Sequence, residues 1–279
     1  MRTHQQEVFT GNRFEFGANW TRFLRLLNDD RIYRAEQSLK DMLGVADLKG
    51  KRFLDVGSGS GLFSLAARRL GAAVHSFDYD PRSVACTEEL KRRFFAVDTD
   101  WIVEEASVLD RDYLDKLGQF DVVYSWGVLH HTGAMWEALD NILPRVKGGG
   151  GLLFIAIYND QGWKSIAWWW IKYLSNRLPR RLRRPFAYLV GCFAYMANIA
   201  KYTVKLKPMV AIEPLLKYGR NYRGMSISHD MVDWIGGFPY EVASYSSLSS
   251  YIEKRGFELI KGKKVTTLGC NEMVFRSAR

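Results

Sequence analysis

Short apolar runs separated by longer amphipathic stretches dominate the first part of the chain. The apolar runs begin at Phe53, Val74, Trp101, Phe120 and Leu152, and each ends in a polar or glycine-rich turn. Apolar runs of this length indicate buried strands, and the intervening helical periodicity indicates crossover helices. The pattern therefore predicts an α/β fold with a doubly wound, mostly parallel sheet.

The two ends of the chain add to this sheet. A helical pattern covers about Arg22–Leu43, before the first strand. After the fifth strand, the pattern predicts a helix near Ser247–Arg255 and a closing strand pair at Phe257–Val265 and Asn271–Phe275. We therefore expect seven strands.

A glycine-rich loop follows the first strand. The strand carries Asp55, and glycines follow at Gly57, Gly59 and Gly61. The dinucleotide-binding loop places its third glycine one residue later, where this chain has Leu62, so NAD or FAD is disfavoured. A carboxylate at Asp55 would repel a pyrophosphate but accept hydrogen bonds from an amine. The loop is better suited to a positively charged cofactor, although a lone glycine loop can also be a plain tight turn.

An acid also ends the second strand. Asp78 lies about 20 residues beyond the glycines, where a carboxylate commonly binds both ribose hydroxyls. The alternative is a helix N-cap before Pro81. Together, the two acids and the glycines predict a nucleoside cofactor.

In these features the chain resembles the class I S-adenosylmethionine-dependent methyltransferases. Their first motif is a strand followed by acid-x-Gly-x-Gly-x-Gly, as at residues 55–61, and the resemblance extends over the strands to about residue 158. It implies a Rossmann-like methyltransferase fold with S-adenosyl-L-methionine as cofactor and S-adenosyl-L-homocysteine as product. Position 107, where the family often has an acid, is Ser107. The resemblance implies that the cofactor contacts Asp55, Gly57, Ser58, Gly59, Gly61, Asp78, Tyr79, Ser107, Val108, Ser125 and Trp126.

The loop after the fourth strand bears on the substrate. It reads Ser-Trp-Gly-Val at residues 125–128, whereas enzymes that methylate exocyclic base nitrogens have an Asn-Pro-Pro-Tyr-like stretch there. The resemblance is greatest to the quinone-type and natural-product O-methyltransferases. It implies methylation of an oxygen or nitrogen of a small, lipid-linked or anionic metabolite. An RNA methyltransferase and a non-catalytic cofactor-binding or scaffold protein stay open as alternatives.

Histidines are the candidate bases, because an imidazole with a pKa near neutrality can deprotonate a hydroxyl or an ammonium. His130 and His131 follow the fourth strand at its carboxyl end, and His229 stands beside Asp230 in a polar, glycine-rich segment. A structural role is the alternative for each. No metal site is expected.

Residues outside the central motifs are candidates for substrate contact. An aromatic-rich stretch at 14–20 precedes the first helix, and residues 1–45 are expected to form a helical lid. Trp20 in that stretch either closes the site or packs in the core. The other candidate substrate residues are Tyr158, Arg223 and Glu241.

Composition limits the class of protein. The chain has 279 residues, 47% of them hydrophobic, which is enough for one enlarged domain with a full core. Its three cysteines, Cys86, Cys192 and Cys270, are far apart, so neither a disulfide framework nor a zinc site follows. The first residues lack the apolar run of a signal peptide. We expect a cytoplasmic protein, peripheral at the inner face of the membrane if it binds lipid.

Residues 161–245 form an insertion after the fifth strand, so the methyltransferase domain is expected at 46–160 and 246–279. Between Lys164 and Arg223 the sequence has thirteen Lys or Arg and one acid, Glu213, although the formal net charge of the whole chain is only +10. Tryptophans precede this basic run. Three interpretations stay open: contact with an anionic membrane through 163–207, contact with nucleic acid, or a cap with a solvated basic face. The cap is also a candidate homodimer interface.

Overall fold

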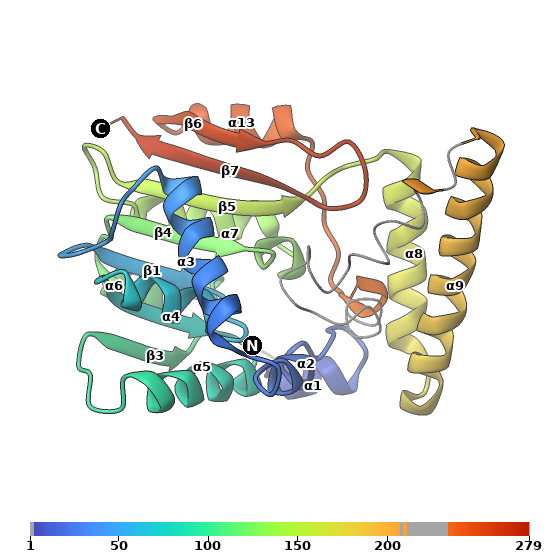
Figure 1. The fold of residues 1–279 in the computed structure, drawn as a ribbon, viewed down its shortest axis with the longest axis horizontal. Helices are drawn as coiled ribbons and strands as arrows, with labels where there is room; N and C mark the ends of the chain where they lie inside the picture. The colour runs from blue at the N-terminus through green and yellow to red at the C-terminus, as the bar shows by residue number, and fades with distance from the viewer. Residues whose placement is uncertain (1–2, 207–208, 211–233, 279) are drawn as a thin grey trace.

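The sheet of this protein has seven strands, as the sequence predicts. The computed structural model describes residues 3–206, 209–210 and 234–278, and its strand order is β3-β2-β1-β4-β5-β7-β6 (Figure 1). β7 pairs antiparallel with β5 and β6, and the other neighbouring strands pair parallel. The strands are β1 (Arg52–Val56), β2 (Ala73–Asp78), β3 (Trp101–Glu105), β4 (Val122–Trp126), β5 (Leu152–Tyr158), β6 (Phe257–Lys263) and β7 (Cys270–Ser277).

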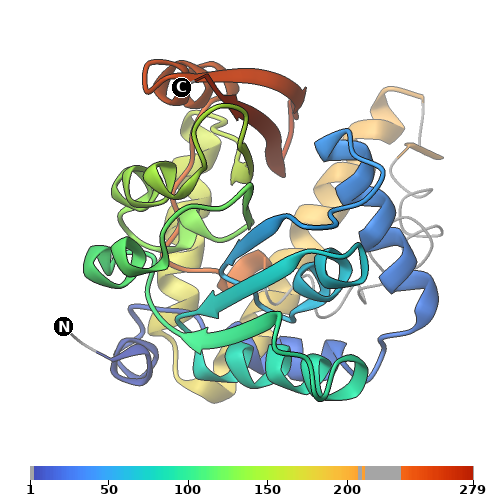
Figure 2. The ribbon, with the colours of Figure 1, turned by 90° about the vertical axis from the view of Figure 1, so that its left-hand side faces the viewer.

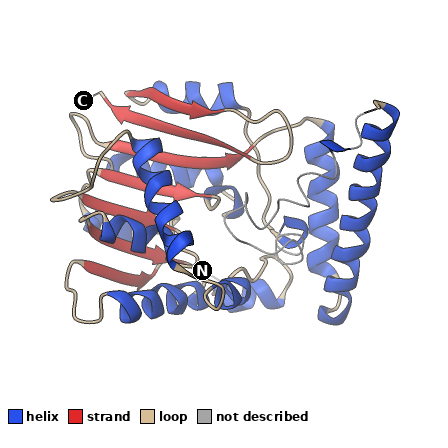
Figure 3. Cartoon of the chain, in the orientation of Figure 1, coloured by secondary structure: helices blue, strands red, loops and turns tan. Residues whose placement is uncertain are grey.

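Helices cover both faces of the sheet, which explains the nearly continuous apolar sequence of the central strands. One face packs against α3 (Asp29–Leu43), α4 (Leu62–Arg69) and α5 (Pro81–Phe94). The other face packs against α6 (Arg111–Leu117), α7 (Met135–Ile142) and α13 (Tyr245–Glu253). Figures 2 and 3 show the sheet between these two layers. The core is therefore split in two by the sheet, with Leu39 and Leu65 on one side and Leu139 and Leu248 on the other.

The N-terminal segment forms three helices, and the single helical pattern predicted over about Arg22–Leu43 is corrected. α1 (His4–Phe9) and α2 (Gly17–Phe23) come first, and α3 starts only at Asp29. The break lies at Asn28, whose side chain accepts a hydrogen bond from the Arg31 amide at 3.0 Å. Asparagine in this role starts a new helix, because it satisfies an otherwise unpaired backbone N–H.

The insertion leaves the sheet after β5 and contains α8 (Trp163–Arg177) and α9 (Arg180–Val204). These two helices lie side by side beyond the carboxyl ends of the parallel strands (Figure 1). The chain returns at Ala243, which pairs with Asn159 next to the point of departure. In the described ranges, no helix combines the length and apolarity needed to cross a bilayer.

Candidate functional site

A cavity of about 630 Å³ opens at the carboxyl edge of the sheet. Its walls come from the loops after β1, β2, β3 and β4, from the N-terminal segment, from Tyr158 at the end of β5, from the facing ends of β6 and β7, and from Trp234 of the insertion. Ligands bind at this edge in open α/β folds, because the strand order reverses there and leaves a crevice. In this sheet the reversal falls between β1 and β4.

The glycine loop forms the floor of the cavity. Gly57 has a φ of +80°, and a Cβ at this position would lie 2.3 Å from the Val128 side chain. A Cβ at Gly59 would lie 3.2 Å from the Trp20 ring. Only glycine therefore fits at Gly57, and the exposed backbone allows a ligand to approach closely.

Asp78 lines the cavity at the end of β2 and fixes the glycine loop. Its Oδ2 accepts a hydrogen bond from the Gly59 amide at 2.8 Å, and its Oδ1 accepts one from the Asp80 amide at 2.9 Å. Burial raises the pKa of Asp78 to about 6. A carboxylate accepts up to about four hydrogen bonds, so acceptor capacity remains for a ligand in the cavity.

Asp55 is the second carboxyl group in the cavity wall. The Ser64 hydroxyl donates a hydrogen bond to its Oδ2. Burial is the main reason that the pKa of Asp55 is raised to about 7, and the charge of Asp78 adds to the effect. Burial suppresses the ionisation of both carboxyl groups, and the charge of Asp78 suppresses that of Asp55 further, so a cation would stabilise the ionised forms.

The other predicted cofactor residues divide into two groups. Ser58, Tyr79, Ser107, Val108 and Trp126 line the cavity. Gly61 and Ser125 do not line it.

Gly61 and Ser125 are not among the residues that line the cavity, and their predicted contact with the cofactor stays a prediction. A Cβ at Gly61 would lie 2.8 Å from the Thr87 backbone, so this glycine allows α4 and α5 to pack closely. The Ser125 side chain is buried and donates a hydrogen bond to the Val56 carbonyl at 3.0 Å. Both residues hold the scaffold rather than the cavity surface.

His131 lines the cavity, with its tautomer fixed by one contact. Its Nδ1 lies 2.6 Å from the Pro239 carbonyl oxygen, which can only accept, so Nδ1 carries the proton and Nε2 carries the lone pair. Burial, followed by the charge of Lys172, lowers the pKa of His131 to about 3. The expectation of a histidine with a pKa near neutrality is therefore wrong for His131, because desolvation disfavours its cationic form.

His130 is fully buried and does not line the cavity. Its Nδ1 accepts a hydrogen bond from the Tyr158 amide at 3.3 Å, so Nε2 carries the proton. Burial lowers the pKa of His130 well below the usual value. This geometry corresponds to the structural alternative for His130.

The candidate substrate residues are also separated by the structure. Trp20 and Tyr158 line the cavity. The Glu241 carboxylate does not, because it accepts hydrogen bonds from the Met135 amide, at 3.0 and 3.2 Å, and so caps α7. The fourth candidate substrate residue, Arg223, lies outside the described residues, as do the candidate catalytic residues His229 and Asp230.

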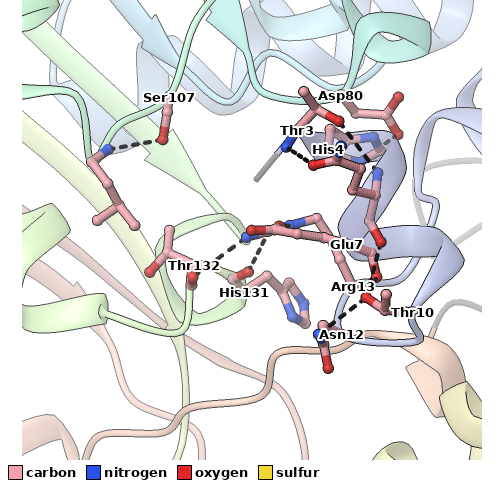
Figure 4. A network of polar contacts seen from close by, with 12 residues as sticks. Thr3, His4, Glu7, Thr10, Asn12, Arg13, Asp80, Ser107, His131 and Thr132 are labelled. Atoms are coloured by element: carbon pink, nitrogen blue, oxygen red, sulfur yellow. Dashed lines mark hydrogen bonds and ion pairs between the residues drawn. The ribbon is translucent and has the colours of Figure 1, made fainter. Parts of the chain in front are cut away.

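Sequence reasoning missed a polar network that closes the cavity from the N-terminal side (Figure 4). The Arg13 guanidinium donates to Glu7 at 2.6 Å and to the His131 carbonyl at 2.8 Å, and lies 5.0 Å from the centre of the Tyr79 ring. Asp80 accepts a hydrogen bond from the Gly17 amide at 2.8 Å. No motif marks these residues, because the contacts join positions that are far apart in the sequence.

Lys172 is a second feature without a sequence signal. This residue of α8 is fully buried, and its Nζ donates to the Trp234 carbonyl. The ammonium lies 4.9 Å from the Tyr240 ring centre, 5.3 Å from that of Trp234 and 5.7 Å from that of Tyr158. Three aromatic faces around one cation provide a favourable electrostatic environment for a buried charge.

Comparisons with known proteins agree with this geometry. The family described as "Methyltransferase domain" matches residues 27–197, which is more than half of the chain. A ubiquinone biosynthesis O-methyltransferase from Ralstonia nicotianae is 32% identical over 137 residues, which cover 48% of this chain and 55% of that protein. A tRNA U34 carboxymethyltransferase from Methylococcus capsulatus is 32% identical over 126 residues, 44% of this chain and 38% of that protein. The aligned region thus spans little more than half, or less, of these relatives.

Solved structures show the same fold at low sequence identity. PKMT2 from Rickettsia typhi superposes with a TM-score of 0.59 at 12% identity, over 88% of this chain and 54% of that one. Magnesium protoporphyrin IX methyltransferase from Synechocystis PCC 6803, crystallised with bound S-adenosylhomocysteine, superposes with a TM-score of 0.52 at 12% identity, over 88% and 83%. Together with the match over residues 27–197, the fold and the cavity place this chain in the methyltransferase domain family, among the class I S-adenosylmethionine-dependent methyltransferases.

Proposed function

We propose that this protein transfers the methyl group of S-adenosylmethionine to an oxygen or nitrogen of a small, largely apolar molecule. The observation that carries the proposal is Asp78, a cavity-lining carboxylate at the end of β2 that also holds the Gly59 amide. The cofactor, when bound, supplies a methyl group on a sulfonium centre that departs as a neutral thioether.

The cavity residues fit this cofactor. The free acceptor capacity of Asp78 suits two ribose hydroxyls, and Asp55 suits an ammonium group, since burial raises the pKa of both carboxyl groups and a cation would stabilise their ionised forms. The bare backbone at Gly57 and Gly59 allows close approach. We assign the adenine to the loop that contains Ser107 and Val108, which line the same cavity.

The acceptor side of the cavity is aromatic. Phe14, Phe16, Trp20, Trp126 and Trp234 contribute to its lining. Such a surface favours a flat or apolar acceptor, because its burial removes apolar area from water. We therefore propose an acceptor with an aromatic or isoprenoid body.

His131 provides a polar contact on this side. Its Nε2 carries a lone pair, which can accept a hydrogen bond from an acceptor hydroxyl and orient the oxygen for in-line attack. A group with a pKa of about 3 is a weak base. We therefore propose that His131 orients the acceptor hydroxyl and does not deprotonate it before the methyl group is transferred.

Calorimetry with S-adenosylhomocysteine tests the proposal. We expect micromolar binding by the unmodified protein and about a tenfold to hundredfold loss for Asp78→Asn, because a hydrogen bond to a charged group contributes about 1.5–3 kcal/mol. The matched control is Glu105→Gln, which changes an exposed carboxylate at the register-paired end of β3.

Methyl release in the presence of aromatic hydroxyl compounds then tests the acceptor class. Binding of the cofactor without turnover on any hydroxyl or amine acceptor would contradict the proposed substrate class. Absence of binding heat would contradict the enzyme proposal itself and favour the non-catalytic alternative.

A further inference from the structure

The helix α8 has an inverted distribution of polar and apolar side chains. The face that packs toward the sheet carries buried polar residues, Ser165, Lys172 and Asn176. The opposite face carries exposed apolar residues at helical spacing, Trp163, Ile166, Trp170 and Leu174, with Trp163 74% exposed. A surface helix of a globular protein has the opposite arrangement, so the outer face of α8 fits an apolar environment.

A second exposed apolar stripe runs along α9. Its side chains recur at intervals of three, four, seven or eight residues and therefore share one face. Phe193 is 77% exposed and Leu189 is 70% exposed. The complete stripe is Leu182, Leu189, Phe193, Met196 and Val204. The buried residues of α9, Ala187 and Gly191, lie on the opposite side of the helix.

The charge of this region has one sign. From residue 163 to residue 206 the sequence contains nine Lys or Arg and no Asp or Glu. Arg181 and Arg184 are exposed near the start of α9, and Lys201 and Lys205 are exposed near its end. Basic side chains therefore flank the apolar stripe of α9 at both ends.

We propose that the outer surface of the α8–α9 hairpin, residues 163–206, docks on an anionic lipid bilayer and lies in the plane of its head groups. The apolar stripes would enter the interface, the tryptophans of α8 would sit at head-group level, and the lysines and arginines would contact lipid phosphates. The hairpin stands at the outer side of the molecule, away from the sheet, so the bilayer can reach it (Figure 1).

Two other occupants fit the surface less well. A second copy of the chain would bring two acid-free, basic surfaces together, and like charges at an interface repel. A nucleic acid would meet the phosphate-binding charges and could stack on Trp163, Trp170 and Phe193, but the other side chains of the two stripes are not aromatic, so their exposed apolar area would have no partner in a nucleic acid. The combination of apolar stripes with basic flanks is complementary to anionic lipid.

The docking surface is connected to the cavity through α8. Lys172, on the buried face of α8, lies over the rings of Tyr158 and Trp234, and both of these residues line the cavity. Docking would therefore bring the cavity close to the bilayer. On the function proposed above, this position suits an acceptor that partitions into the membrane.

Vesicle flotation tests the docking surface independently of catalysis. The probe is the full-length protein with vesicles of phosphatidylcholine alone or with added phosphatidylglycerol. We expect flotation with the anionic vesicles that weakens as salt rises. The double variant Leu189→Ser/Phe193→Ser should lower the partition coefficient by about tenfold or more, and Arg181→Gln/Arg184→Gln should lower it similarly and reduce its salt dependence.

The matched control is Phe94→Ser/Val97→Ser, which removes an exposed aromatic and an exposed aliphatic side chain outside the hairpin, with Val97 98% exposed. It should float like the unmodified protein. Binding of S-adenosylhomocysteine and the circular dichroism spectrum verify that each variant is folded, so a failure of docking is distinguished from a failure of the proposed function.

Several outcomes would overturn the inference. One is no flotation of the unmodified protein with anionic vesicles, and another is equal loss in the hairpin and control variants. A dimer that Leu189→Ser/Phe193→Ser dissociates, without flotation, would replace lipid by a second copy. RNA retention that falls steeply with salt, without flotation, would replace it by nucleic acid.

Discussion

At the scale of single residues, the two acidic side chains in the cavity carry the electrostatics of the site. Burial raises the pKa of Asp78 to about 6 and the pKa of Asp55 to about 7, from an ordinary value of 3.8. With a pKa of about 7, Asp55 should be partly protonated at neutral pH before a ligand binds. Cationic and hydroxyl groups of a ligand stabilise the ionised forms, so ligand binding should release protons.

This coupling predicts the pH dependence of cofactor binding. Affinity for S-adenosylhomocysteine should fall as pH decreases through about 7 and then about 6, because the empty site must lose protons before it binds. The maximal slope is about tenfold per pH unit for each proton released. Calorimetry across this range, in buffers of different ionisation enthalpy, measures both the affinity and the protons released.

The variant Asp78→Asn serves as the control for this prediction. It should remove the component of the pH dependence near 6 and leave the component from Asp55. The same slope in both proteins would show that Asp78 does not titrate with binding.

At the scale of elements, the loop after β1 and the turn after β4 interlock. Gly57 faces Val128 so closely that a methyl group would overlap the Val128 side chain at 2.3 Å. Gly127 has a similar positive φ of +76° but no atom within 4 Å of its Cβ position. A substitution at Gly127 therefore introduces backbone strain alone, whereas a substitution at Gly57 introduces both backbone strain and steric overlap.

Gly57→Ala should destabilise the fold more than Gly127→Ala. Both place alanine in the left-handed region, which costs about 1–2 kcal/mol, and Gly57→Ala adds an overlap of about 1–3 kcal/mol. Denaturant unfolding measures each free energy. In the Gly57→Ala/Val128→Ala double variant, we expect most of the overlap component to disappear, because only the Val128 Cβ, 2.9 Å from the added methyl group, remains. Additive losses in the cycle would show that the Val128 methyl groups are not the obstacle.

Most elements of the fold could be predicted from the sequence. Every strand of the sheet and the placement of Asp78 at its edge follow from apolar runs and the glycine loop, because these signals are local. The break at Asn28 was missed, since helical periodicity continues on both sides of it. Cap chemistry at a single residue decided that boundary.

The site was less predictable where it depends on contacts between distant segments. The Arg13 network joins α1 to the loop after β4, and Glu241 turns away to cap α7. The low pKa of His131 comes from burial, which no motif encodes. Sequence spacing identifies which residues lie near the carboxyl edge, and packing determines which of them face the cavity.

At the scale of the whole molecule, the insertion and the sheet domain are coupled through one buried charge. Lys172 belongs to α8, yet its charge is the second cause of the lowered pKa of His131, after burial. Tyr158 contacts both residues. Its ring centre lies 5.4 Å from that of His131 and 5.7 Å from the Lys172 Nζ. The insertion thereby influences the electrostatics of the cavity.

Removal of the Lys172 charge should change the pKa of His131. In Lys172→Met the pKa of His131 should rise from about 3 but stay below 6.5, because burial still disfavours the cation. Loss of the bond to the Trp234 carbonyl should also cost about 1–3 kcal/mol of stability. NMR titration of the His131 ring measures the pKa. Lys164→Met, an exposed change on the same helix, should leave it unaltered; an unaltered pKa in Lys172→Met as well would refute the coupling.

The insertion departs from and rejoins the sheet domain at one backbone pair. The Ala243 amide donates to the Tyr158 carbonyl at 3.0 Å, and the Asp160 amide donates to the Ala243 carbonyl at 3.2 Å. Because its two ends are hydrogen-bonded to each other, the intervening chain can change in length or sequence without altering the register between β5 and β7. On the proposed function, in which Trp234 of the insertion lines the acceptor side of the cavity, an insertion exchanged at this pair should change the acceptor and leave the cofactor residues of the sheet domain in place.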